Sequence, residues 1–347
     1  TEEIQPEEVY LSVPPEVVMN VDSARASAPL NEFVGAVSRS RDGAFFILLM
    51  HLLHERFVLG ESSKYWPYLR LLPTLEEIHP PITYDGHEMA LLDGSDLKAS
   101  IKRMDKLVGR HWDGLKQFAS TVSPIFAESG GLSEAQFRWA HYILDSRCIW
   151  WGGGRHLVPL LDLINCNEGP DPTRIHSTNL DDAGTNALTK ADRHYPKGSQ
   201  LFENYGQPNH TYLQYHGFVL DSNTHDCTMF SIEVNQADVR RLNGDSSIIR
   251  RRMREGGFNS GIQTFCVGGG GKTLEDDARL RAWLAIKFGH EGSDYSDVVD
   301  DFKGLVEERL SLYPDPNTYD DAMQGHVALK LVGQEKAMLN TLLTTMA

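Results

Sequence analysis

The stretch LFENYGQPNHTYLQYHGF, residues 201 to 218, is the part of this sequence that decides the fold. Three shorter motifs precede it in order: RWA at 138 to 140, DSR at 145 to 147, and VPLLDLIN at 158 to 165. From Arg155 to about Val219, short apolar runs are broken by clusters of Gly, Pro and Asn, which is typical of short strands and structured loops. We therefore expect short strands and loops around Tyr205.

The segments outside this region follow different patterns. VYLSV, at 9 to 13, alternates and ends at two prolines, which predicts a short strand closed by a turn. From about Leu30 to Ala140 apolar residues recur at helical spacing. Beyond Asp221 a brief strand-like FSIEV gives way to helical patterns, including ARLRAWLAIKF and HVALKLVGQEKAMLNTLL. The sequence thus predicts strands flanking a helical insertion, followed by a helical tail.

Charge and size narrow the choice of partners. The chain has 347 residues, 41% of them hydrophobic, which is enough for more than one core. Lys and Arg total 33 against 48 Asp and Glu, and a net charge of -15 would repel a phosphate backbone. We therefore expect no direct nucleic-acid partner.

The spacing of the cysteines and the length of the apolar runs bear on where in the cell this protein is expected. The four cysteines show no metal-ligand spacing, so Cys227 and Cys266 are expected to stand alone and an oxidising compartment is not indicated. The longest apolar run, Ala44 to Leu53, is far short of the roughly 20 residues that span a bilayer. The start TEEIQPEEVYLSVP shows no secretory signal. We expect an intracellular protein without a membrane segment; cytoplasm, nucleus and plastid are not distinguished.

Two other motifs have simpler structural explanations. VGGGGKT, at 267 to 273, lacks the first glycine of a phosphate-binding loop because Cys266 stands in its place, so a flexible connection is expected. His51, His54 and Glu55 fall within one helical turn, but without a third distant ligand they are interpreted as a solvated or hydrogen-bonded helix surface.

The ordered motifs resemble the SET-domain protein methyltransferases, in the branch that includes Rubisco large-subunit methyltransferase and the actin-histidine methyltransferase. That pattern runs SR, then [IV]P..D..NH, then YG followed by an N, then GF. Upstream, LSVP, SARAS and SSKYWPYLRLLP look like the family's first strand and the start of its helical insertion. Downstream, LYPDPNTYDDAM and ALKLVGQEKAMLN look like its helical substrate-binding domain.

The resemblance implies an α+β fold in four parts. These are the N-terminal part of the SET domain (1–35), a helical insertion (36–137), the catalytic part (138–222) and a helical substrate-binding domain (223–347). The cofactor it implies is S-adenosylmethionine, and the reaction is methyl transfer to a protein side chain. No metal is implied.

The resemblance also assigns the site residues. Tyr205 matches the family's catalytic tyrosine, whose hydroxyl can orient the accepting amine without changing its own protonation. A cofactor with a carboxylate, an ammonium and a purine calls for a cation, several acceptors and apolar walls. The cofactor-binding residues implied by the motifs are Arg147, Asp162, Asn165, Cys166, His216, Gly217 and Phe218.

Three departures from the family pattern bear on activity and specificity. Cys166 stands where the family usually has histidine, and a thiol forms only weak hydrogen bonds. The GxG segment that precedes the family's first strand is not among the residues of this chain. Cys148, Ile149 and Leu161 differ from the neighbourhoods found in the histidine-modifying relative.

These departures leave three functions open. We expect a protein-lysine N-methyltransferase; the alternatives are a protein-histidine methyltransferase and a catalytically impaired SET-fold module that binds a partner. Because the cysteine-rich zinc cluster of many histone methyltransferases is missing, the expected substrate is a folded non-histone protein. A monomer is expected, with membership of a larger complex left open.

Overall fold

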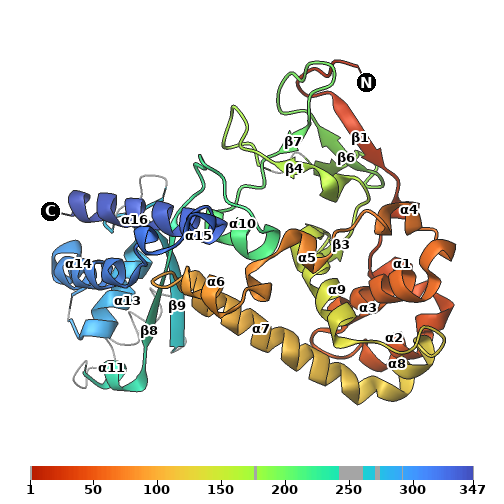
Figure 1. Cartoon of the computed structure of the whole chain (residues 1–347), viewed down its shortest axis with the longest axis horizontal. Helices are drawn as coiled ribbons and strands as arrows, with labels where there is room; N and C mark the ends of the chain where they lie inside the picture. The colour runs from red at the N-terminus through yellow and green to blue at the C-terminus, as the bar shows by residue number, and fades with distance from the viewer. Residues whose placement is uncertain (1, 176–177, 242–260, 270–273, 291, 347) are drawn as a thin grey trace. The chain divides into compact units, whose positions relative to one another are not determined.

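The computed structural model describes residues 2–175, 178–241, 261–269, 274–290 and 292–346. The chain forms two compact units (Figure 1). The first consists of Thr1–His79 and Arg103–Gly206, and the second of Pro80–Lys102 and Gln207–Ala347. Pro80–Lys102, which lies inside the predicted helical insertion, therefore belongs to the second unit. The four-part division itself stays a prediction.

The strands of the first unit are short, as expected. β1 (Val9–Val13) pairs antiparallel with β6 (Ala187–Lys190), which pairs antiparallel with β5 (Thr178–Leu180). The predicted VYLSV strand is thereby confirmed. A small apolar cluster covers this sheet, formed by Val13, Val18, Val158, Leu161 and Ala187.

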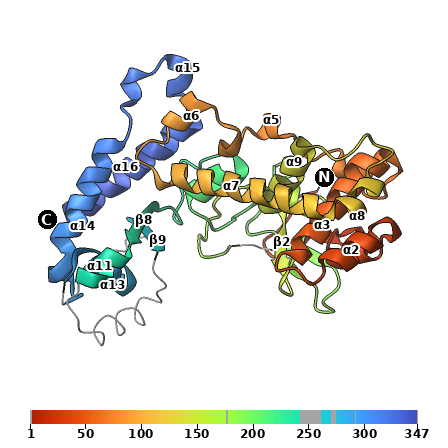
Figure 2. The same ribbon diagram turned by 90° about the horizontal axis from the view of Figure 1, so that it is seen from below.

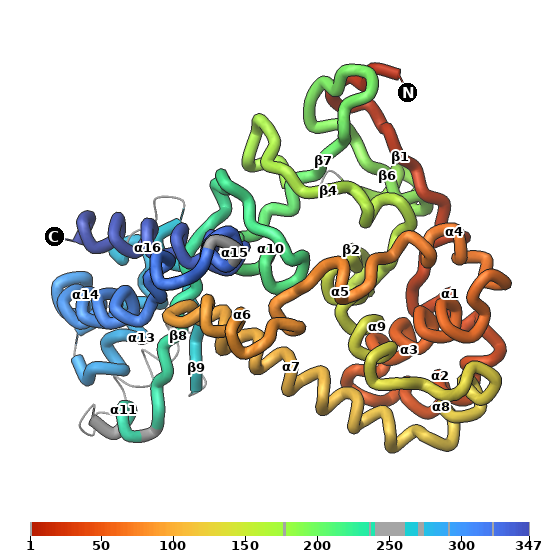
Figure 3. The backbone as a smooth tube through the Cα atoms, viewed as in Figure 1, coloured from red at the N-terminus to blue at the C-terminus, as the bar shows by residue number. Residues whose placement is uncertain are grey.

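Two further strand pairs hold the segments around the predicted site. β2 (Ile149–Trp151) and β3 (Gly154–His156) form a hairpin through Gly152 and Gly153, both at positive φ, as a tight turn of this kind requires. β4 (Asn165–Cys166) and β7 (Phe202–Glu203) are parallel neighbours (Figure 3). Parallel pairing needs a long connection between the strands, so these two segments meet only through the tertiary fold.

The helical part of the first unit surrounds α3 (Gly43–Leu53), which is buried on nearly all sides because its residues are apolar all round. α1 (Val21–Arg25), α2 (Asn31–Val37) and α9 (Glu134–Arg147) contact it. Also in this unit are α4 (Trp66–Leu69), α5 (Leu75–Ile78), α8 (Ala119–Ile125) and the larger part of α7 (Asp96–Leu115).

The helix of α3 continues beyond the apolar run through a π-helical turn, His54–Leu59, and a 3-10 turn, Gly60–Ser62. Among the described residues, Gly43–Ser62 is the one helical stretch long and apolar enough to cross a membrane, with 20 residues and a mean hydropathy of 1.4. Over half (56%) of an 18-residue window in this stretch is buried in the fold, as in the core helix of a globular protein. Length and composition are therefore weak evidence for a membrane segment here.

The second unit is mainly helical. α14 (Tyr295–Leu312) and α16 (Val327–Thr345) lie side by side (Figure 2), and α13 (Ala278–Phe288) packs on α14 and on β8 (Thr228–Val234). β8 pairs antiparallel with β9 (Gly261–Val267). The unit also contains α6 (Gly86–Ala90), α10 (Asn209–His216), α11 (Gln236–Arg241) and α15 (Asp321–Gln324). One apolar core, whose largest fully buried side chains include Trp283 and Phe302, joins these elements; the helices confirm the helical tail.

Two expectations are wrong in the second unit. Residues 209–216 form α10, where strands and loops were expected, because Pro208 starts the helix and Gly217, at φ 75°, ends it. Cys227 and Cys266 do not stand alone: they form a disulfide that joins the residue before β8 to β9, with their Cα atoms 5.4 Å apart. Strand pairing brings together two cysteines that are 39 residues apart in sequence.

Candidate active site

The β4–β7 pair aligns two of the sequence motifs. Asn165 lies opposite Phe202 and Cys166 opposite Glu203, so the end of VPLLDLIN runs beside the start of ENYG. Glu203 is buried, and its Oε1 accepts hydrogen bonds from the backbone and hydroxyl of Thr178, at 3.2 and 3.0 Å. These bonds hold β7 against the small sheet and so fix the chain that leads into Tyr205.

Tyr205 is half-buried, and its hydroxyl donates a hydrogen bond to the main-chain carbonyl of Ile164 at 2.5 Å. Burial raises the pKa of Tyr205, and the nearby Cys166 and Glu203 raise it further. The side chain is therefore neutral at physiological pH. Its hydroxyl oxygen keeps lone pairs that can accept a hydrogen bond.

Gly206 makes the turn after Tyr205 possible. It has φ 63°, and a Cβ at this position would lie 2.5 Å from Cγ2 of Ile175. Asn204 Oδ1 accepts the backbone N–H of Gly206 at 2.9 Å. Only glycine fits this left-handed and crowded position, so the turn has one conformation that points Tyr205 at β4.

Arg147 and Asp162 form the charged part of the site. The Asp162 side chain is 1% exposed, and Arg147 Nη1 donates to the Asp162 carbonyl at 2.9 Å and lies 3.7 Å from Oδ2. The hydroxyl of Tyr68, from α4, donates to the same Oδ2 at 2.7 Å. Burial raises the pKa of Asp162 to about 6, although the charge of Arg147 and the bond from Tyr68 oppose that rise.

The geometry can be compared with known proteins. No protein-family model matches the chain. A solved SET domain of Rubisco LSMT bound to lysine and AdoHcy superposes with a TM-score of 0.74 at 17% identity, covering 99% of this chain and 82% of that one. Rubisco LSMT bound to AdoMet gives the same TM-score and covers 83% of that chain.

The chain has the SET-domain fold.

Proteins similar in sequence are named as methyltransferases that act on a protein. The actin-histidine N-methyltransferase of Mus musculus is 26% identical over 250 residues, which is 69% of this chain and 40% of that protein. The Gallus gallus protein of that name is 26% identical over 253 residues, with the same coverage. The chain spans less than half the length of these relatives.

Within this SET fold, the remaining predicted residues lie in two places. Asn165 is exposed and Cys166 is half-buried and not disulfide-bonded, both on β4 of the first unit. His216, Gly217 and Phe218 belong to the second unit, where α10 ends. Phe218 stacks on Tyr212, with ring centroids 5.1 Å apart.

The structure thus brings five of the predicted site residues into one unit: Tyr205, Arg147, Asp162, Asn165 and Cys166. Their roles in binding and catalysis stay a prediction.

Tyr68 is the residue that sequence reasoning missed. It lies in SSKYWPYLRLLP, which was interpreted as the start of the helical insertion. Nothing in its spacing links it to Asp162, 94 residues later. The one indication in the sequence was that Tyr68 lies in SSKYWPYLRLLP, a segment that resembles the family.

The other motifs lie outside this site. His51, His54 and Glu55 are buried, so the prediction of a solvated or hydrogen-bonded helix surface is wrong, although Glu55 does accept a hydrogen bond from Ser63. The helix is enclosed because α1, α2 and α9 contact α3, and α4 contacts the π-helical turn. VGGGGKT is described only as far as Gly269; residues 270–273 lie outside the described part of the chain.

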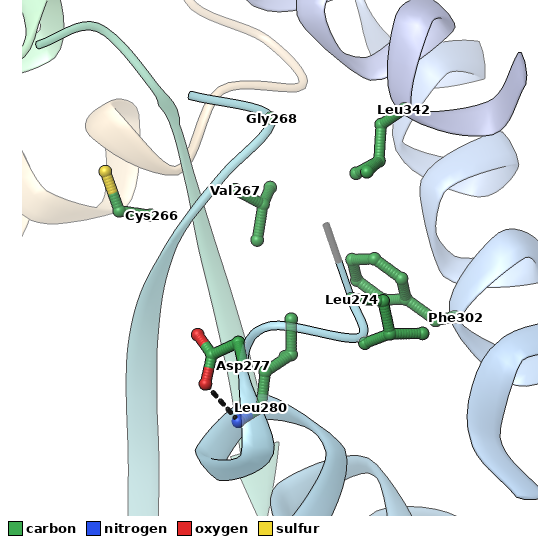
Figure 4. A pocket seen from close by; sticks show the side chains of 8 residues that line it. All are labelled: Cys266, Val267, Gly268, Leu274, Asp277, Leu280, Phe302 and Leu342. Atoms are coloured by element: carbon green, nitrogen blue, oxygen red, sulfur yellow. Dashed lines mark hydrogen bonds between the residues drawn. The ribbon is translucent and has the colours of Figure 1, made fainter. Parts of the chain in front are cut away.

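An apolar pocket in the second unit also lacks catalytic groups. It is lined by Cys266, Val267, Gly268, Leu274, Asp277, Leu280, Phe302 and Leu342 (Figure 4). Asp277 is its one charged residue and accepts the backbone N–H of Leu280 at 2.8 Å, as the N-cap of α13. None of the predicted site residues lines it.

Proposed function

We propose that this protein transfers a methyl group from S-adenosylmethionine to a lysine side chain of a folded non-histone protein. The observation that carries the proposal is the placement of Tyr205 in a SET-domain fold, with its hydroxyl anchored on the Ile164 carbonyl beside the β4–β7 pair. The activities named for the similar proteins support methyl transfer to a protein as the class of reaction.

The residues around Asp162 fit the amino-acid end of the cofactor. Arg147 Nε and Asp162 Oδ1 are buried and have no hydrogen-bond partner among the described residues. Buried donors and acceptors are normally satisfied, so this unmatched pair suits a ligand with one anionic and one cationic group. Arg147 would hold the carboxylate and Asp162 the ammonium. When bound, the cofactor supplies a sulfonium methyl group as the electrophile.

Tyr205 would align the accepting amine. Methyl transfer to nitrogen is an in-line displacement, so the chain has to orient a neutral nucleophile and exclude water rather than titrate. The Tyr205 hydroxyl uses its proton on Ile164 and is left with lone pairs that can accept from the amine. The amine is neutral when it attacks, and it loses its extra proton to solvent afterwards.

The residues near Arg147 favour lysine over histidine as the side chain that accepts the methyl group. Cys148 and Ile149 follow that arginine, where the histidine-modifying relative is expected to have a polar residue. Burial raises the pKa of the Cys148 thiol, which keeps it neutral and weakly bonding. Leu161 lies in the apolar cluster of the first unit. These groups offer few partners for an imidazole. The actin-histidine relatives nevertheless make histidine the second candidate.

Calorimetry with S-adenosylmethionine tests the first part of the proposal. A methyltransferase is expected to bind the cofactor in the micromolar range; no measurable heat would leave the impaired binding module as the function. Incubation of a cell lysate with labelled cofactor, followed by mass spectrometry, tests the second part. Label on lysine supports the proposal, whereas label confined to histidine would replace it with the second candidate.

A further inference from the structure

We infer that Tyr68 is a positioning residue for cofactor binding: its hydroxyl holds the Asp162 carboxylate in the orientation and the ionised state in which that carboxylate receives the cofactor. The inference rests on the proposed function and adds a residue from α4, in the segment that leads into the helical insertion. Tyr68 acts through Asp162 and is not itself expected to touch the cofactor.

The two carboxylate oxygens of Asp162 differ in their hydrogen-bond partners. Oδ2 of Asp162 accepts from the Tyr68 hydroxyl at 2.7 Å and faces Arg147 Nη1 at 3.7 Å, while Oδ1 has no partner among the described residues. The terminal torsion of an aspartate is soft, so one hydrogen bond decides the orientation of the carboxylate plane. Tyr68 therefore leaves Oδ1 as the oxygen available to a ligand.

Tyr68 is itself held rigidly. Glu55, buried in the π-helical turn, accepts the Ser63 hydroxyl at 2.5 Å, and Ser63 Oγ accepts the backbone N–H of Tyr65 at 3.0 Å. This relay fixes the turn from which α4 begins, with Pro67 in its first turn. Tyr68 is only 4% exposed. A side chain packed in this way loses little further entropy when it holds its hydrogen bond.

The charge of Asp162 depends on few neighbours. From α9 and its end, Arg147 and Cys148 face it; from α4, Tyr68; and from the segment after β7, Tyr205. Burial raises the pKa of Cys148, Tyr68 and Tyr205, so these three are neutral near pH 7. Burial raises the pKa of Asp162 to about 6, and Arg147 and Tyr68 are the groups that limit the rise. Without the Tyr68 hydroxyl, Asp162 would be protonated nearer to neutral pH.

The test is the pH dependence of S-adenosylmethionine affinity, measured by calorimetry on the full chain from pH 5 to 9. In the parent protein, affinity is expected to fall as pH drops through about 6, because Asp162 loses its charge. In Tyr68→Phe the same fall is expected about one pH unit higher, with about threefold weaker binding at pH 6.5, close to tenfold weaker binding at pH 5 and near-parent affinity at pH 9. Asp162→Asn is expected to bind weakly at every pH.

The second unit offers a matched control. Tyr313 is also buried and donates to a buried carboxylate, Glu335 Oε2, at 2.8 Å. Tyr313→Phe is expected to lower the melting temperature while leaving the midpoint of cofactor binding at the parent pH. A purely structural role for Tyr68 would make the two variants alike, with an unshifted midpoint, and that result would overturn the inference.

A gentler change covers the case in which Tyr68→Phe fails to fold. 3-Fluorotyrosine placed at position 68 keeps the ring and hydroxyl but is a stronger donor, so the midpoint is expected to move to lower pH. An unchanged midpoint would contradict the inference. Absence of cofactor binding by the parent protein at any pH would reject the proposed function together with it, whereas binding with unshifted variants rejects the inference alone.

Discussion

The Tyr205 hydroxyl is held by an acceptor that cannot titrate, the main-chain carbonyl of Ile164. Burial raises the pKa of Tyr205, so we expect the side chain to act as a fixed dipole and not as a base in the proposed reaction. Its position depends on Gly206, which alone fits the turn against Ile175. At the scale of single residues, the proposed site thus depends on one anchored hydroxyl and one left-handed glycine.

Replacing Tyr205 by Phe is expected to lower turnover about 100-fold, because the loss of one positioned polar group from a transition state costs about this much. Cofactor affinity should stay within about threefold, since no cofactor contact is assigned to the hydroxyl. Single-turnover kinetics with saturating cofactor measures the first quantity, and calorimetry the second. Full turnover in the variant would remove Tyr205 from the mechanism.

At the scale of elements, the helix formed by α3 and the π-helical turn carries buried histidine side chains with ring nitrogens that lack hydrogen-bond partners among the described residues. Both ring nitrogens of His51 and Nδ1 of His54 are buried and unpartnered among the described residues. Glu55 Oε1 lies 3.7 Å from His51 Nδ1, which is too long for a hydrogen bond. Burial lowers the pKa of His51 to about 4. A neutral, unsatisfied imidazole therefore sits in the core.

His51→Leu is expected to raise the free energy of unfolding at pH 7 by about 1 to 2 kcal/mol, because it removes the desolvation penalty of unpaired nitrogens. The gain should be larger at pH 5. The folded pKa of His51 lies below the unfolded value, so the parent loses stability as pH falls below 6.5. Denaturant unfolding measures both values. His87→Leu, at an exposed histidine, is the control and should change little; a destabilised His51→Leu would contradict the expectation.

The β8–β9 ladder is closed by the Cys227–Cys266 disulfide, across a sequence separation of 39 residues. On the chain-entropy model, a loop of about 40 residues gives about 4 kcal/mol of stabilisation. Reduction with dithiothreitol is therefore expected to lower the melting temperature of the second unit. Cys227→Ser should melt at the lower temperature with or without reductant. Equal melting of the parent in both conditions would show that the bond contributes nothing.

At the scale of the whole molecule, each unit has its own buried polar connections between distant segments. In the second unit, Glu335 of α16 accepts from Ser95, just before α7, at 3.0 Å and from Tyr313, after α14, at 2.8 Å. Burial raises the pKa of Glu335 to about 7, which the bonds from Tyr313 and Ser95 and the charge of Arg309 oppose. The folded state therefore binds a proton here more tightly than the unfolded chain.

Because the pKa of Glu335 is higher in the folded state than in the unfolded state, the stability of the protein depends on pH in one direction. The contribution of Glu335 to stability is fully present below pH 4.5 and is lost as pH rises through about 7. Glu335→Gln, which stays neutral and keeps hydrogen-bonding capacity, is expected to stabilise the second unit by about 2 kcal/mol at pH 8 and by little at pH 5. Hydrogen exchange at both pH values, read in α14 and α16, provides the measurement. A variant less stable than the parent at pH 8 would show that Glu335 is ionised and well paired.

The sequence by itself determined the first strand and the helical tail, because period-2 and period-3.6 patterns and turn residues act locally, and the resemblance of its ordered motifs implied the SET fold. The tertiary structure alone decided which motifs meet. The parallel β4–β7 pair, the bond from Tyr68 to Asp162 and the Cys227–Cys266 disulfide each join residues far apart in sequence. The burial of His51 and Glu55 was missed for the same reason: a local pattern shows which face is apolar, whereas only packing shows what covers the other face.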